Sequence, residues 1–125
     1  MTVEFTNREI SSCIYSLTYM QKKLRADSNR SFAFNGFSSA YERINANYYK
    51  VASLKKFFKK ALKEQTLTLE LNDEQLLVLQ QTMNDFETAV KTFGRPNKTD
   101  WIAFELNKQI VNKIGLAKTY PSMLF

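Results

Sequence analysis

The segment from Ser38 to Gln65 constrains the fold most strongly, because its apolar side chains recur at steps of three and four residues. At 3.6 residues per turn, this spacing places them on one side of an α-helix. The sequence therefore predicts a long amphipathic helix whose apolar stripe faces the core. The stripe comprises Ile44, Tyr48, Val51, Leu54, Phe58 and Leu62.

The same segment carries the surplus charge of the chain. Residues 50–63 contain six lysines and no acid, whereas the whole chain has 18 basic and 12 acidic side chains and a net charge of +6. Each residue of an α-helix is rotated by about 100° around the axis from the residue before it. This rotation places four of these lysines and a tyrosine on a different side of the helix from the apolar stripe. Lys55 falls at the edge of the stripe, where its methylenes can cover core surface, so we leave it out. The resulting lysine face consists of Tyr49, Lys56, Lys59, Lys60 and Lys63.

Two interpretations of the lysine face are open. It could be a solvated helix surface that keeps the protein in solution, or a docking surface for a negatively charged partner. Like charges at these spacings repel by a few tenths of a kcal/mol per pair, and no acid within residues 50–63 relieves the repulsion. This concentration of charge favours the docking surface.

A helix start is encoded near the N-terminus. Thr6 is typical of an N-cap, and Glu9, three residues later, completes a capping box. Apolar residues at helical spacing then predict a first helix that extends to about Ala26. Cys13 lies within this stripe, which favours a small core residue over a reactive thiol.

A long loop over residues 27–37 is predicted between the first two helices, because Asn35 and Gly36 are typical of a turn. The loop is rich in phenylalanine, with rings at positions 32, 34 and 37. These rings could fold back into the core, or form an exposed anchor that fills a partner's pocket or stacks on a base. The candidate binding residues of this loop are Arg30, Phe34 and Phe37.

Two short segments are predicted to be strands. Residues 66–71 alternate polar and apolar side chains, and residues 2–5 show a shorter version of the same pattern. When the sequence is aligned with itself so that Val3 is matched to Leu69, the two capped helices that follow these positions are also matched. This echo could reflect a duplicated strand-helix-helix unit, although any two capped amphipathic helices align in this way. If the strands pair with each other, they satisfy backbone groups that a lone strand leaves open.

Capping signals also define the remaining helices. Ser38 or Ser39 is expected to cap the second helix, with Glu42 completing a box from Ser39. Asn72 is typical of the cap of a third helix. Gln75 is expected to complete a capping box with Asn72, and Gly94 is expected to end the third helix. The fourth helix is expected to begin at Asn97 or Thr99 and to end at Gly115.

Composition agrees with a helical domain. A chain of 125 residues suits one domain, residues 1–125, and 44% hydrophobic residues with three glycines and two prolines argue against disorder. We therefore predict a mainly α fold, a compact bundle of about four helices with a minor two-stranded β element. The apolar tail, residues 116–125, is expected to close either the core or an interface, and the oligomeric state is open.

The cellular location is inferred from signals that the sequence lacks. One cysteine excludes an internal disulfide framework, and we find neither an export signal nor an apolar run of membrane-spanning length. We therefore expect a soluble cytoplasmic protein.

The side chains on which most catalytic and metal sites depend are scarce. The chain has no histidine and one cysteine, and its three glycines are explained by turns or helix ends rather than by a phosphate-binding loop. Asp85 and Glu87 are two residues apart and diverge around a helix, so they do not resemble an acid-base pair. We therefore predict a protein that is not an enzyme and has no cofactor or metal.

Two classes of function fit these patterns. The first is a small interaction protein, of inhibitor or adaptor type, that docks the lysine face, with or without the aromatic loop, onto an acidic protein surface. The alternative is nucleic-acid binding without sequence preference, in which the same lysines neutralise phosphates. The lysine face lacks arginine, which reads guanine edges, and this favours the protein partner. Binding to a membrane is disfavoured, because the apolar stripe is expected to lie in the core.

Overall fold

The computed structural model describes residues 1–92 and 94–115. Four helices and one two-stranded antiparallel sheet form a mainly α fold, as the sequence predicted. The predicted placement of the tail, residues 116–125, lies outside the described residues. The elements are β1 (Thr2–Glu4), α1 (Asn7–Asn35), α2 (Ser39–Glu64), β2 (Thr68–Glu70), α3 (Asp73–Thr92) and α4 (Lys98–Ile114).

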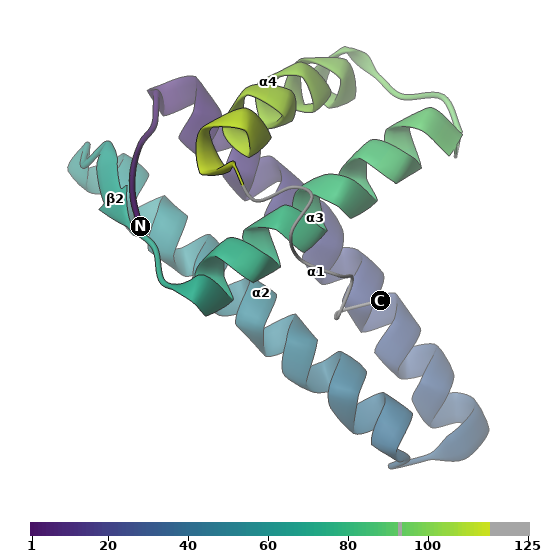
Figure 1. Cartoon of the computed structure of the whole chain (residues 1–125). Helices are drawn as coiled ribbons and strands as arrows, with labels where there is room; N and C mark the ends of the chain where they lie inside the picture. Colours follow the sequence, from purple (N-terminus) through teal and green to yellow (C-terminus); the bar gives the residue numbers. More distant parts are fainter. Residues whose placement is uncertain (93, 116–125) are drawn as a thin grey trace.

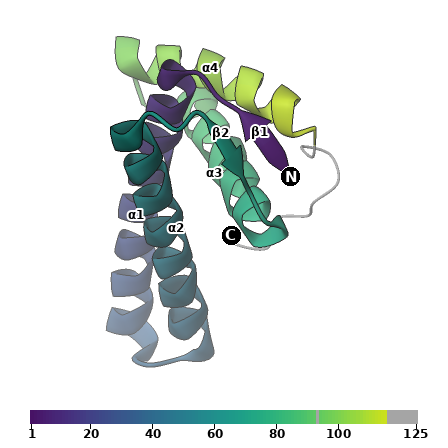
Figure 2. The same cartoon turned by 90° about the vertical axis from the view of Figure 1, so that its left-hand side faces the viewer.

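A long antiparallel hairpin of α1 and α2 is the largest feature of the molecule. These helices have 29 and 26 residues, whereas α3 and α4 have 20 and 17. The closed end of the hairpin therefore projects beyond the other elements (Figures 1 and 2). The order strand, helix, helix occurs twice along the chain, as the sequence echo suggested.

Reciprocal hydrogen bonds fix the start of α1. The Thr6 hydroxyl accepts from the Glu9 N–H at 3.1 Å, and the Glu9 carboxylate accepts from the Thr6 N–H at 2.8 Å. This confirms the predicted capping box. For α2 the cap is Ser38, whose hydroxyl accepts from the Tyr41 N–H at 3.2 Å. Ser39, the other candidate, is the first residue of the helix.

The prediction of a long loop over residues 27–37 is wrong. α1 does not end at Ala26 but continues to Asn35, and only residues 36–38 separate it from α2. The turn itself lies where the sequence placed it, because Gly36 has φ +61° and its N–H donates to the Phe32 carbonyl at 2.8 Å.

Packing against α2 explains why α1 continues. Residues 27–35 contain neither glycine nor proline, so no residue in them stops a helix that has already begun. Ser28 is fully buried, and its hydroxyl donates to the Arg25 carbonyl of its own helix at 3.1 Å. Tertiary contact thus favours the helix over the loop that a polar composition indicates.

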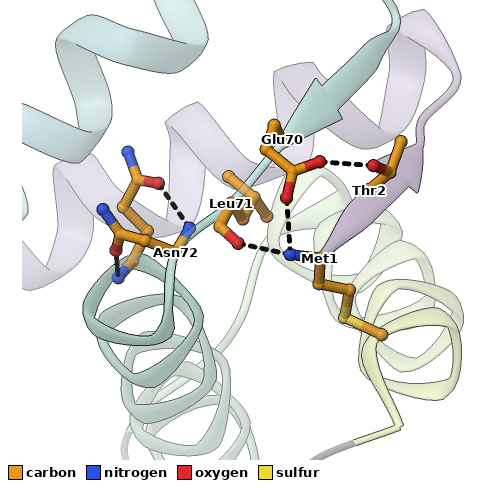
Figure 3. A network of polar contacts seen from close by, with 6 residues as sticks. Met1, Thr2, Glu70, Leu71 and Asn72 are labelled. Atoms are coloured by element: carbon orange, nitrogen blue, oxygen red, sulfur yellow. Dashed lines mark hydrogen bonds and ion pairs between the residues drawn. The ribbon is translucent and has the colours of Figure 1, made fainter.

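The two strands pair with each other, with Val3 opposite Leu69. The N-terminal ammonium of Met1 donates to the Glu70 carboxylate at 2.8 Å and to the Leu71 carbonyl at 2.9 Å (Figure 3). Each strand spans three residues and is shorter than predicted. The pairing ties the start of the chain to the junction between α2 and α3.

Polar side chains set the remaining helix starts and the contact between α1 and α4. The caps are Asn72 with Gln75, at 2.8 and 2.9 Å, and Asn97 with Asp100, at 2.8 and 3.0 Å. Where α4 crosses α1, buried Asn107 accepts from the Ser12 hydroxyl at 2.7 Å and donates to the Ser16 hydroxyl at 2.8 Å.

The main core lies between the base of the hairpin, the sheet and α3, and it includes Ile110 and Ile114 of α4.

One buried side chain in α3 lacks hydrogen bonds. Gln80 is 1% exposed, and within residues 1–92 and 94–115 neither its amide nitrogen nor its amide oxygen has a partner. We predict that Gln80→Met, which keeps a similar volume, raises the free energy of unfolding by about 1–2 kcal/mol, because it removes an amide that folding desolvates without compensation. Urea denaturation measures the change.

Gln109→Met serves as the matched control for this prediction. Gln109 is exposed on α4, so its replacement should change the free energy of unfolding by less than about 0.5 kcal/mol. A loss of stability in Gln80→Met would contradict the interpretation that the amide is unsatisfied.

Candidate docking surface

The lysine face forms on α2 as the sequence predicted. Lys56, Lys59, Lys60 and Lys63 are exposed, and Tyr49 is 58% exposed beside them. Within residues 1–92 and 94–115, no carboxylate lies within ion-pair distance of these four ammonium groups. The face therefore presents positive charge that the described part of the protein does not neutralise.

Lysines elsewhere in the protein differ from those of the lysine face. Four of them, on α1, α3 and α4, form ion pairs with carboxylates. A charged group pairs readily where an acid is within reach. Within the described residues, however, even exposed Glu64, four residues after Lys60, forms no ion pair with the lysine face. The pairs are Lys23 with Asp85, Lys91 with Glu87, Lys108 with Glu105 and Lys113 with Glu9.

Helix α1 contributes further basic side chains where it packs against α2. Gln21 connects the helices, because its amide nitrogen donates to the Tyr48 hydroxyl and its amide oxygen accepts from the Lys55 ammonium, both at 3.2 Å. The Arg25 guanidinium lies 3.9 Å from the centre of the Tyr48 ring. We call Lys22, Arg25, Tyr48, Lys55 and Lys59 the seam cluster.

The pKa shifts in the seam cluster arise first from burial and hydrogen bonding, and nearby positive charges add to them. Partial burial lowers the pKa of Lys55, and the nearby charges of Lys59 and Lys22 lower it further. Hydrogen bonds from Arg25 and Gln21 lower the pKa of the Tyr48 hydroxyl, because they stabilise its anionic form. No carboxylate contributes to either shift.

Sequence reasoning missed the part of this surface that α1 supplies. Lys55 was left out because it lies at the edge of the apolar stripe, yet its ammonium reaches the seam. Lys22 and Arg25 could have been found only by pairing the two helices in the correct register. The lysine face and the seam cluster share Lys59, so the two are continuous.

The aromatic residues at the closed end of the hairpin are exposed rather than folded into the core. Phe34 and Phe37 are 81% and 76% exposed. The rings of Phe32 and Phe37 lie 4.9 Å apart, and Tyr41 of α2 packs on both, at 5.5 and 5.6 Å. Arg30 pairs with Asp27 of its own helix at 3.4 Å.

The predicted binding residues therefore form two separate groups. Tyr49 and Lys56 lie ten and seventeen residues along α2 from its first residue, Ser39. At 1.5 Å per residue, this places them roughly 15 and 25 Å along the helix from the aromatic end. Arg30, Phe34 and Phe37 thus do not share a site with the lysine face.

Three further findings bear on function. Comparison of the chain with protein-family models, with curated proteins and with solved structures gave no match. Within the described residues, no group of His, Cys, Asp and Glu side chains is arranged to hold a metal ion. None of the helices described combines the length and hydropathy that crossing a membrane requires.

The single cysteine is fully buried in α1. Burial raises the pKa of the Cys13 thiol well above its ordinary value, and the negative charge of Glu9 adds to the shift. We predict that Ellman's reagent does not modify the folded protein and titrates one thiol in guanidinium chloride, because only the thiolate reacts. Rapid modification under native conditions would contradict the burial of Cys13.

Proposed function

We propose that this protein is a non-enzymatic interaction protein, of inhibitor or adaptor type, that docks its lysine face onto an acidic surface of a partner protein. The observation that carries the proposal is the set of four exposed lysines that have no carboxylate within ion-pair distance in the described part of the chain. On each of the other helices, at least one lysine pairs with an acid. Acidic groups of a partner would supply the missing counter-charges.

The distribution of charge along the chain supports this proposal. The hairpin, residues 7–64, contains twelve basic and four acidic side chains, whereas the remainder of the chain contains six basic and eight acidic ones. The hairpin is therefore strongly positive and the rest of the chain weakly negative. Such an asymmetric field orients the protein as it approaches an acidic surface and raises the rate of association.

Charge reversal tests the lysine face directly. We predict that the triple variant Lys56→Glu, Lys59→Glu, Lys60→Glu keeps its helical circular dichroism, because these side chains are exposed and contribute little to the core. The same variant should lose capture of the partner from nuclease-treated extract of the cell that makes the protein.

A matched triple variant controls for net charge. Arg8→Glu, Arg95→Glu and Lys98→Glu change the charge equally, but lie at exposed positions at the start of α1 and near the start of α4. This variant should retain partner capture. If the α2 variant binds as well as the unmodified protein, the lysine face is not the docking surface.

Nucleic-acid binding is the second candidate function, and one observation favours it. Tyr49 is largely exposed among the lysines, and the Arg25 guanidinium stacks on the neighbouring Tyr48 ring. Aromatic faces beside cations are typical of proteins that bind single strands through stacking and phosphate contacts.

Salt dependence distinguishes the two candidates. If four lysines neutralise phosphates of a DNA duplex, the logarithm of the binding constant should fall with the logarithm of salt concentration with a slope of about −3.6. The protein-partner function predicts no detectable duplex binding at 50 mM salt in fluorescence anisotropy. A slope near the calculated value would favour nucleic acid over an acidic protein.

A further inference from the structure

The closed end of the hairpin carries four neighbouring aromatic side chains, which together we call the aromatic end. Phe32 and Phe34 lie in the last turn of α1, Phe37 lies in the connection that follows, and Tyr41 lies in the first turn of α2. Phe34 is 81% exposed, Phe37 76% and Phe32 45%. Among the described residues, Phe34 is the most exposed large apolar side chain.

The core ends before the aromatic end begins. The last buried apolar side chain of α1 is Leu24, eight residues before Phe32, and the first of α2 is Val51. The closed end also projects beyond α3 and α4, so neither helix covers the rings (Figures 1 and 2). The exposed phenylalanines therefore contribute little to the core, and replacing them should leave the fold intact.

The rings hold one another in place. The ring centres of Phe32 and Phe37 are 4.9 Å apart, and the Tyr41 ring lies 5.5 and 5.6 Å from them, within the range of favourable aromatic pairs. Gly36, which precedes Phe37, has φ +61°, a conformation that glycine adopts without strain. Because the rings are already ordered, a partner that binds them loses less side-chain entropy.

The charges around the aromatic end cancel. Residues 27–43 contain two basic and two acidic side chains, and one of these pairs, Arg30 with Asp27, is in contact at 3.4 Å. The aromatic end is therefore apolar and neutral, in contrast to the lysine face. Nucleic acids and anionic membranes attract clustered cations, so neither complements this end. An uncharged apolar surface does.

The exposed area of the rings suits an anchor rather than a whole interface. An aromatic side chain buries about 150–250 Å², so the exposed fractions of Phe32, Phe34 and Phe37 correspond to roughly 300–500 Å². Two copies that met end to end would bury roughly 600–1,000 Å², below the range of about 1,200–2,000 Å² for stable interfaces. A few projecting aromatic rings that fill a pocket are instead typical of the residues that carry most of the binding energy in a larger interface.

We propose that the aromatic end is a second docking surface, which inserts Phe34 and Phe37 into an uncharged apolar pocket of a partner protein. This inference goes beyond the proposed function, because it does not depend on the lysine face. The protein then presents two surfaces of different chemistry on one hairpin, one that recognises charge and one that recognises an apolar pocket.

Photo-cross-linking followed by calorimetry tests the inference. p-Benzoylphenylalanine replaces Phe34 in the cell that makes the protein, and mass spectrometry identifies the captured protein, which is then purified. Isothermal titration calorimetry measures its affinity for the full-length chain. We expect Phe34→Gln and Phe37→Gln each to weaken binding at least about tenfold, because each removes an aromatic anchor. Both should also make the heat-capacity change of binding less negative, since less apolar surface is buried.

Salt concentration and a matched variant separate the aromatic end from other surfaces. The factor lost in Phe34→Gln should change by less than about twofold between about 50 and 300 mM salt, because screening does not weaken an apolar contact. Ile102→Gln is the control, since it removes an exposed apolar side chain from α4. It should keep the affinity within about twofold of that of the unmodified protein.

The other outcomes overturn the inference. If Phe34→Gln and Phe37→Gln bind the captured protein as tightly as the unmodified chain does, no pocket receives these rings. Capture of no protein, or only of a second copy of this chain, would also contradict a partner pocket. Sedimentation of the unmodified protein with phosphatidylcholine vesicles, lost in Phe34→Gln, would assign the aromatic end to a membrane instead. None of these results affects the proposed function, which the charge-reversal variants test separately.

Discussion

The packing of α1 against α2 is the interaction on which the rest of the structure depends. Each helix has one apolar stripe, and both stripes are buried: Leu17, Met20 and Leu24 on α1 belong to the same core as Val51, Leu54 and Phe58 on α2. Burial of one side of a helix fixes the direction of the opposite side. The core therefore orients the lysine face toward solvent, because rotating α2 to hide the lysines would expose its apolar stripe.

The body of the protein holds the base of this hairpin and leaves its other end free. The strand pair and the N-terminal ammonium join β1 to the junction after α2, while α4 crosses the first part of α1 through Ser12, Ser16 and Asn107. Helix α3 also contacts the hairpin, through the ion pair between Lys23 and Asp85. The closed end of the hairpin projects beyond α3 and α4 (Figure 2). Residues 50–63, which carry the lysine face, lie in the opposite half of α2, toward the end that the body of the protein holds.

Features encoded by local interactions were predictable from the sequence. The caps at Thr6 and Asn72 and the lysine face of α2 depend on residues within one or two turns of each other, and all were predicted. Asn97, the cap of α4, was one of two predicted candidates. The extension of α1 to Asn35 and the seam cluster were not predicted. Both depend on contacts between α1 and α2 whose register the sequence pattern does not specify, as the hydrogen bond from Lys55 to Gln21 illustrates.

The central claim is that contact occurs through the lysine face of α2. The most direct measurement is photo-cross-linking in the cell that makes the protein, with p-benzoylphenylalanine in place of Lys56 or, as a control, of exposed Lys98 at the start of α4. Mass spectrometry then identifies what each position captures. The account predicts an acidic protein cross-linked from position 56 and not from position 98. Equal capture from both positions, or capture from position 98 alone, would contradict it.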